Sequence, residues 1–181
     1  IVNGFKAQGF SAEMVGTGQT SWLEGTPYSL VLDALINDFV AGELEHAVWR
    51  CDREAKPEVI VIEGQGSLMN PAYPGGFEIL AATRPHVIVL QHAPMRRDYD
   101  GFPGYPIHAL STQIQALELL SSRPVVAITI NHEGLEPDAV VPTCEAIQRV
   151  TGLPTCDPLV QGVDILMSAL VADLAQNGVG S

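Results

Sequence analysis

Short apolar runs alternate along the chain with longer segments whose apolar positions follow helical spacing. The apolar runs predict strands at residues 12–15, 59–62, 87–90 and 125–130, and a short extended piece at 153–156. Helical spacing and turn residues predict helices at 29–54, 77–83, 106–122, 137–150 and 160–176, and residues 1–8 resemble the end of another helix. The pattern therefore indicates strands and helices that follow one another in turn.

Such an alternation is typical of a parallel sheet covered by helices on both faces. We predict an α/β fold, namely a three-layer sandwich around a mostly parallel sheet. A length of 181 residues suits one domain with a full core, so residues 1–181 are expected to form a single α/β domain. Ligands of such sheets lie at the carboxyl ends of the strands, so the loops that follow the strands are expected to line the site.

Composition and charge narrow the choice of partners. Apolar residues make up 46% of the chain and charged residues 17%, which indicates a well-packed globular protein. The net charge of −12 would repel phosphates, so no nucleic acid partner is expected. No apolar run has the length of a membrane span and no signal peptide is recognisable, so we expect a cytoplasmic protein without membrane contact. Cys51, Cys144 and Cys156 show neither disulfide nor metal-ligand spacing and are expected to be free thiols.

The loop after the 59–62 run carries the most informative side chains. Glu63 directly follows four apolar residues, and a carboxylate at a buried strand end is costly unless it meets a cation or a hydrogen-bond donor. In phosphate-binding α/β proteins such an acid usually reaches Mg²⁺, while capping of a helix or pairing with an arginine is the alternative. Glycines on both sides of Gln65 let a ligand approach the backbone closely. The candidate residues of this loop are Glu63, Gly64, Gln65, Gly66 and Ser67.

A second polar loop follows the first predicted strand. Its candidate residues are Thr17, Gly18, Gln19 and Thr20, which precede Ser21. Hydroxyls, an amide and backbone N–H groups together could bind a carboxylate or a phosphate. An ordinary polar turn accounts for the same residues equally well.

Two later strands also end in polar residues. His92 follows the 87–90 run, where its imidazole could act as a general base near neutral pH, and His132 has the same kind of position. Each could instead be an ordinary hydrogen-bonded loop residue. Arg96 and Arg97 lie in a long loop, 93–105, which is either functional or mobile. The two arginines could hold an anion or be surface charges.

Two familiar nucleotide-binding motifs do not occur in these residues. There is no G-x-x-x-x-G-K-[ST] phosphate loop for ATP or GTP, and no G-x-G-x-x-G follows the first strand. The residues themselves therefore give no direct support for a nucleotide hydrolase or a dehydrogenase.

Three segments resemble a known family. TGQTSW at 17–22, LDALINDFVAGELEHAV at 32–48 and VIEGQGSLMNPAYPGG at 61–76 are similar to the carboxyl-terminal P-loop-type domain of the bacterial D-glutamate N-acetyltransferase-like family. The second half, with Asn131 after a strand and TGLP at 151–154, resembles the wider class that contains dethiobiotin synthetase. The resemblance implies a P-loop NTPase-like fold. In the wider class, the residue matched by Glu63 helps to hold Mg²⁺, and the one matched by Asn131 lies near the nucleotide base.

Family members usually carry a phosphate loop, and a further domain, before the strand that leads into TGQT. The resemblance therefore implies that this chain is the carboxyl-terminal domain of a longer protein. It begins at Ile1, inside what would be the helix after that phosphate loop.

For activity, the resemblance implies an N-acyltransferase that uses acetyl-CoA to acetylate the amino group of an acidic amino acid such as D-glutamate. The expected roles are Glu63 or His92 as general base, Gln65, Ser67 or backbone N–H groups as oxyanion donors, and Arg96 or Arg97 for the substrate carboxylate. Mg²⁺ at Glu63 is possible, and a homo-oligomer is expected. Two alternatives stay open: a Mg-nucleotide-dependent ligase or kinase, and a non-catalytic ligand-binding or oligomerisation domain.

Overall fold

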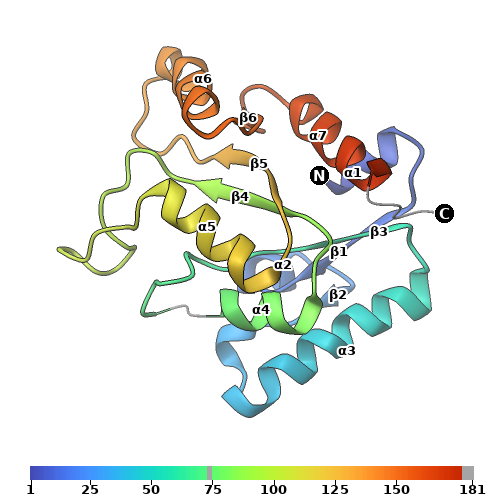
Figure 1. Cartoon of the computed structure of the whole chain (residues 1–181). Helices are drawn as coiled ribbons and strands as arrows, with labels where there is room; N and C mark the ends of the chain where they lie inside the picture. The colour runs from blue at the N-terminus through green and yellow to red at the C-terminus, as the bar shows by residue number, and fades with distance from the viewer. Residues whose placement is uncertain (73–74, 177–181) are drawn as a thin grey trace. The chain divides into compact units, whose positions relative to one another are not determined.

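The computed structural model describes residues 1–72 and 75–176, so Tyr73 and Pro74 of the NPAYPGG segment lie outside the described part. The chain divides into two compact units, unit 1 (Ile1–Arg84) and unit 2 (Pro85–Ser181), whose helices and strands are labelled in Figure 1. Both units are built from parallel strands joined through helices, as predicted for an α/β fold. The expectation that residues 1–181 form a single domain stays a prediction.

Unit 1 is built on a parallel sheet of three strands in the order β2-β1-β3. Its elements are helix α1 (Val2–Ala7), strand β1 (Ala12–Gly16), helix α2 (Gln19–Leu23), strand β2 (Tyr28–Ser29), the 3₁₀ helix η1 (Leu32–Ala34), helix α3 (Asn37–Ala55), strand β3 (Val59–Ile62) and helix α4 (Gly76–Thr83). β3 coincides with the run predicted at 59–62. In the register of the sheet, Ala12 pairs with Val59 and Val15 with Ile62, so β1 and β3 end side by side.

Helix α3 covers this sheet with an apolar stripe. Val40, Leu44, Ala47 and Cys51 are buried, at the spacing that places side chains on one face of a helix. They pack in one cluster with Val15 of β1. The helix ends before Lys56, which adopts a left-handed conformation with φ of 49° just ahead of Pro57. The predicted end of this helix is therefore confirmed.

The predicted start of the same helix, at residue 29, is wrong. Residues 28–32 instead run along β1, where the N–H of Leu30 donates to the carbonyl of Gly16 at 2.9 Å and the N–H of Leu32 to that of Thr17 at 3.0 Å. Leu30 and Leu32 are buried there, and the helix begins only at Asn37. Pairing with β1 outweighs the helical spacing of these residues, as tertiary contacts commonly outweigh local preference.

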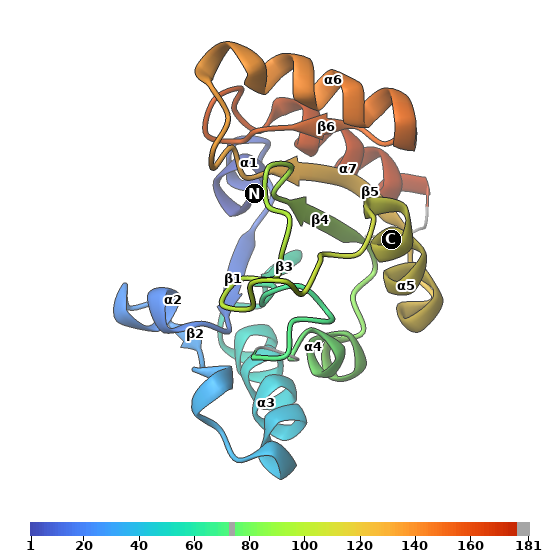
Figure 2. The ribbon, with the colours of Figure 1, turned by 90° about the vertical axis from the view of Figure 1, so that its left-hand side faces the viewer.

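Unit 2 has a second parallel sheet, in the order β4-β5-β6. Its elements are strand β4 (Ile88–His92), helix α5 (Leu110–Ser121), strand β5 (Val125–Ile130), the 3₁₀ helix η2 (Pro137–Ala139), helix α6 (Val140–Thr151), strand β6 (Thr155–Cys156) and helix α7 (Asp164–Gln176). The arrowheads of β4 and β5 point the same way in Figure 1 and in the turned view of Figure 2. Helices α5 and α7 contact β5, and α6 and α7 contact β6.

Three predicted boundaries in unit 2 need correction. β4 continues beyond residue 90 and ends with His92 itself. α5 begins at Leu110 rather than at 106, because the N–H of Ile107 donates to the carbonyl of Arg97 at 2.9 Å and keeps this segment in the loop. α7 begins at Asp164 rather than at 160, because residues 157–161 form a hydrogen-bonded turn.

Two further predictions concern the cysteines and membrane contact. All three cysteines are free and buried. Burial raises the pKa of each thiol, that of Cys51 to about 11. Within residues 1–72 and 75–176, no helix is both long and apolar enough to cross a membrane.

Candidate functional site

The carboxylate of Glu63 organises the strand ends of unit 1. Its Oε2 accepts hydrogen bonds from the backbone N–H of Thr17 at 2.8 Å and that of Gly18 at 3.1 Å. The hydroxyl of Ser21 lies 2.7 Å from the same oxygen and donates to it. Three donors on one oxygen satisfy the half-buried carboxylate without a cation or an arginine.

The register of the sheet brings these residues together. β1 and β3 are paired up to Val15 and Ile62, so Glu63 leaves β3 beside the first residues after β1. The N–H of Glu63 still donates to the carbonyl of Val15 at 2.9 Å. Gly16 allows the close approach, since a Cβ added there would lie only 2.4 Å from Oγ of Ser21.

Gln65 and Thr17 extend this cluster. The amide nitrogen of Gln65 donates to the hydroxyl of Thr17 at 2.9 Å, and that hydroxyl donates to the carbonyl of Glu63 at 3.1 Å. Thr17 is fully buried. Side-chain and backbone hydrogen bonds therefore join the segment after β1 to the predicted loop at 63–67.

The remaining predicted residues of unit 1 lie at the border of the cluster. Gln19 and Thr20 are exposed and belong to the first turn of α2, so the prediction of an unbroken loop from 16 to 21 is wrong. Gly64 and Gly66 are exposed, and Ser67 is half-buried. Exposed backbone around Gln65 leaves N–H groups accessible to a ligand.

The contacts of Glu63 bear on its predicted role with a metal. The hydrogens of three donors point at Oε2, so a Mg²⁺ ion at that oxygen would have to displace them. Among the described residues, no group of three or more His, Cys, Asp or Glu is placed to hold a metal ion. All three donors reach Oε2 and none of them reaches Oε1, so the predicted role of Glu63 with Mg²⁺ stays a prediction.

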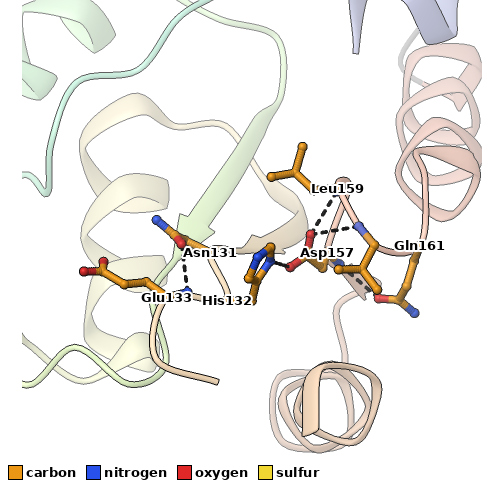
Figure 3. Close-up of polar contacts among 7 residues, drawn as sticks. Asn131, His132, Glu133, Asp157, Leu159 and Gln161 are labelled. Carbon is orange, nitrogen blue, oxygen red and sulfur yellow. Dashed lines mark hydrogen bonds and ion pairs between the residues drawn. The ribbon is translucent and has the colours of Figure 1, made fainter. Parts of the chain in front are cut away.

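Unit 2 holds a second cluster around a different carboxylate, drawn in Figure 3. Asp157 follows β6 directly and is fully buried. Its Oδ1 accepts hydrogen bonds from the backbone N–H of Leu159 at 2.9 Å and of Val160 at 3.2 Å. Its Oδ2 lies 2.5 Å from Nδ1 of His132.

His132 reaches Asp157 from the neighbouring strand. It follows β5, and β5 pairs with β6 through Ile128 with Thr155 and Thr129 with Cys156. The His132 side chain is 41% exposed, whereas that of Asp157 is 0% exposed. The pair therefore joins a buried carboxylate to an imidazole that reaches the surface.

Asn131 connects the ends of β4 and β5. Its N–H donates to the carbonyl of His92 at 2.8 Å, and its side-chain oxygen accepts the N–H of Glu133 at 3.0 Å. Glu133 in turn pairs with Arg96 at 2.5 Å, and both side chains are exposed. Asn131, predicted as a binding residue, thus helps to shape the carboxyl edge of this sheet.

The long loop that carries the two arginines is ordered by its own contacts. The hydroxyl of the buried Tyr99 lies 2.6 Å from Nδ1 of His108, and the carboxylate of Asp98 accepts the N–H of Gly104 at 2.8 Å. Arg97 is exposed, and its carbonyl accepts the N–H of Ile107. These contacts hold the loop in one conformation and do not favour the interpretation of a mobile loop.

His92, predicted as a general base, is the last residue of β4 and is half-buried. Desolvation by burial lowers the pKa of its imidazole, so the neutral ring is favoured. A neutral imidazole can accept a proton, but burial also makes it a weaker base. The position of His92 at the carboxyl end of β4 suits a general base, whereas its lowered pKa makes it a weaker one.

Sequence reasoning overlooked two residues of these clusters. Ser21 was noticed only as the end of a polar loop, and Asp157 was not considered. Asp157 nevertheless carries a weaker form of the signal seen at Glu63, since it is an acid directly after the short extended piece predicted at 153–156. Its partner His132 lies 25 residues away, so only the pairing of β5 with β6 reveals the contact.

Comparison with known proteins identifies a family for most of the chain. Residues 1–167 match the P-loop domain of the family DUF1611_C, described as a domain of unknown function. A protein of Tritonibacter scottomollicae named D-glutamate N-acetyltransferase is 31% identical over 176 residues, which cover 92% of this chain and 51% of that protein. A protein of the same name from Pseudoalteromonas sp is 28% identical over 172 residues, which cover 91% of this chain and 50% of that protein.

A solved structure supports the fold. The crystal structure of a DUF1611 family protein from Anabaena variabilis matches 93% of this chain and 50% of its own, with 31% identity and a TM-score of 0.84. The predicted three-layer α/β fold class and the predicted family resemblance are therefore confirmed. The chain spans about half the length of the curated relatives that it matches.

Proposed function

The chain belongs to the DUF1611 P-loop domain family, and on that premise we propose that its protein is an N-acyltransferase acting on an acidic amino acid. The acyl donor is acetyl-CoA and the acceptor is an amino group such as that of D-glutamate. One observation carries the proposal: 31% identity over 176 residues to a protein named D-glutamate N-acetyltransferase.

The reaction sets three tasks for the side chains. A neutral amine attacks the thioester directly, so the two substrates must be held close together. A group must accept the proton that the amine loses, and hydrogen-bond donors must stabilise the oxyanion. Both clusters lie where β/α folds place ligands, at the carboxyl ends of parallel strands.

We assign ligand binding in unit 1 to Gln65, Ser67 and the exposed backbone of Gly64 and Gly66. Glu63 holds this loop against β1, because its Oε2 is already used by three donors. Its contacts favour a positioning role over proton transfer. Replacing Glu63 with Gln in the full-length protein tests this: unchanged turnover and unchanged response to Mg²⁺ would remove Glu63 from the site.

We assign the substrate carboxylate to Arg97, with Arg96 beside it. Arg97 is exposed on the ordered loop after β4, whereas Arg96 already pairs with Glu133. A guanidinium binds a carboxylate through two parallel hydrogen bonds. Arg97→Lys should therefore raise the KM for the amino acid more than it changes kcat.

The full-length protein tests the proposal directly. Release of free thiol from acetyl-CoA should depend on the amino acid, and D-glutamate, L-glutamate and D-aspartate should differ in rate. Mass spectrometry should find the N-acetylated product. No thiol release with any acidic amino acid would overturn the proposal.

A Mg-nucleotide-dependent ligase or kinase is the second candidate, favoured by the description of the family as a P-loop domain. Calorimetry separates the two. Heat on titration with acetyl-CoA supports acyl transfer, and heat only with ATP and Mg²⁺ supports the second candidate. No heat of binding with acetyl-CoA, with ATP and Mg²⁺ or with D-glutamate supports a non-catalytic domain.

A further inference from the structure

Among the described residues, the pair of His132 and Asp157 is the one place where a buried carboxylate holds an imidazole that reaches the surface. Asp157 is fully buried, and its three hydrogen-bond contacts are to two backbone N–H groups and to Nδ1 of His132. A further bond fixes the turn, since the N–H of Asp157 donates to the side-chain oxygen of Gln161 at 3.0 Å. The carboxylate is therefore held in one orientation before any ligand binds.

These contacts define the tautomer of His132. A carboxylate that already accepts two backbone N–H groups acts as an acceptor toward the ring as well, so Nδ1 donates. A neutral ring with its hydrogen on Nδ1 carries a free electron pair on Nε2. In the described part of the chain, no protein group hydrogen-bonds Nε2, and the side chain is 41% exposed.

The position of the pair suits a ligand. His132 and Asp157 follow two adjacent parallel strands, β5 and β6, at the carboxyl edge of the sheet. Figure 3 shows the imidazole beside Asp157, with Asn131 and Glu133 on either side of it in the chain. Nδ1 faces the buried acid, so Nε2, across the ring, points away from it.

From this geometry we infer that His132 is the general base of the acyl transfer and that Asp157 is the residue that positions it. The inference rests on the proposed function. The strand-end position predicts His132 as a possible base, whereas Asp157 is not predicted. His92 is the less suitable base, because burial lowers the pKa of its imidazole.

The acyl transfer needs no reactant besides the amine and acetyl-CoA. The amine nitrogen forms a bond to the carbonyl carbon of acetyl-CoA, and the bond from that carbon to sulfur breaks. The amine proton moves to Nε2 of His132 and from there to the departing thiolate or to water. The products are the N-acetyl amino acid and free CoA thiol.

Several other titratable groups lie in the same part of unit 2 as His132. Their effect on the pH dependence of the rate must be distinguished from that of His132. They are Asp157, Glu133 with its partner Arg96, His92 at the end of β4, and the thiols of Cys144 and Cys156 near Asp157. The matched control is His86, an exposed histidine just before β4 at the opposite edge of the same sheet.

The experiment uses the full-length protein with acetyl-CoA and D-glutamate. His132→Gln should lower kcat by about 10²- to 10⁴-fold, the usual contribution of a general base, with little change in KM for acetyl-CoA. It should also abolish the acid limb of the pH profile. Asp157→Asn should lower kcat by about 10²-fold and displace that limb, because an amide can donate to Nδ1 and favour the wrong tautomer. His86→Gln should leave kcat and the profile unchanged.

The activity of the wild-type protein distinguishes failure of the proposed function from failure of the inference. If it releases no thiol, the proposed function fails and the inference falls with it. If it is active and His132→Gln keeps both kcat and the acid limb, the inference alone is overturned and the pair is structural. Rescue of His132→Ala by added imidazole would support the base, because a structural defect is not restored by a diffusing base. Circular dichroism melting checks that each variant is folded.

Discussion

Glu63 and Asp157 occupy equivalent positions in the two units, each directly after a parallel strand, yet their surroundings differ. Glu63 is half-buried, and three donors from the loop after β1 and from the start of α2 converge on a single oxygen. Asp157 is fully buried and divides its two oxygens between backbone N–H groups and an imidazole. The first acid ties a loop to the sheet, whereas the second holds a titratable ring that reaches the surface.

The comparison shows that one sequence signal can serve two purposes. An acid after an apolar run must find donors, because an unpaired buried carboxylate is too costly. At Glu63, two backbone N–H groups and the hydroxyl of Ser21 satisfy the charge. At Asp157 one of the donors is an imidazole, and its ring extends from the buried acid to the surface.

The largest expected effect is on the stability of unit 2. Asp157→Ala removes a buried acceptor and leaves the N–H groups of Leu159 and Val160 without their partner. We expect it to lower the free energy of unfolding by about 3 kcal/mol. Glu63→Ala should cost only about 1 kcal/mol, because Glu63 is half-buried and water can enter the space that its side chain leaves. Urea unfolding followed by circular dichroism measures both.

Equal losses in the two variants would contradict the distinction between the two acids. Asp157→Asn serves as the matched control, since it keeps the volume and one acceptor oxygen. It should be more stable than Asp157→Ala.

Much of the fold follows from the sequence because apolar runs identify strands directly. β3 and β5 coincide with the predicted runs, since each is a continuous stretch of apolar or β-branched residues. The start of α3 could not be predicted, because Leu30 and Leu32 have helical spacing but bond to β1 instead. Strand pairing depends on residues far away in the sequence, and a local pattern does not contain it.

The candidate site could be predicted only in part, because the local sequence shows single residues and not the contacts between strands. Glu63 was identified because an acid after four apolar residues is conspicuous. Its partners Thr17 and Gly18 were nominated, although their contact with it depends on the register of β1 and β3. Asp157 was overlooked because β6 is only two residues long and gives a weak strand signal.

A second test asks whether the unit 1 cluster is as tightly fixed as its contacts suggest. A Cβ at position 16 would lie 2.4 Å from Oγ and 2.6 Å from Cβ of Ser21, which must then move away from Glu63. Gly16→Ala should therefore destabilise the protein by about 2 kcal/mol. Gly64→Ala is the control, because a Cβ there meets nothing within 4 Å. Similar stability of the two variants in urea would show that the loop adjusts freely.

A third test compares the thiols of the two units. Burial first, and then the charge of Asp157, raises the pKa of Cys156, while the pKa of Cys51 in unit 1 is about 11 through burial and through acids such as Glu13. Asp157→Asn should therefore speed labelling of Cys156 by a thiol reagent several-fold, because thiolate is the reactive form. Cys51 should react as slowly as before. Peptide mapping after timed labelling at pH 8 gives the rates, and an unchanged rate at Cys156 would refute the role of the charge.

The smallest expected effect concerns the pH dependence that His92 adds to unit 2. Burial lowers the pKa of its imidazole in the folded protein below the ordinary value of about 6.5. Below that value the unfolded chain binds a proton that the folded chain does not, so the stability contributed by neutral His92 is present above pH 6.5 and is lost as the pH falls. His92→Gln should remove this part of the slope, and the difference in unfolding free energy between wild type and variant, measured from pH 8 to pH 5, isolates it. A steeper loss of stability in His92→Gln than in the wild type would reverse the sign and overturn the interpretation of His92 as a buried neutral ring.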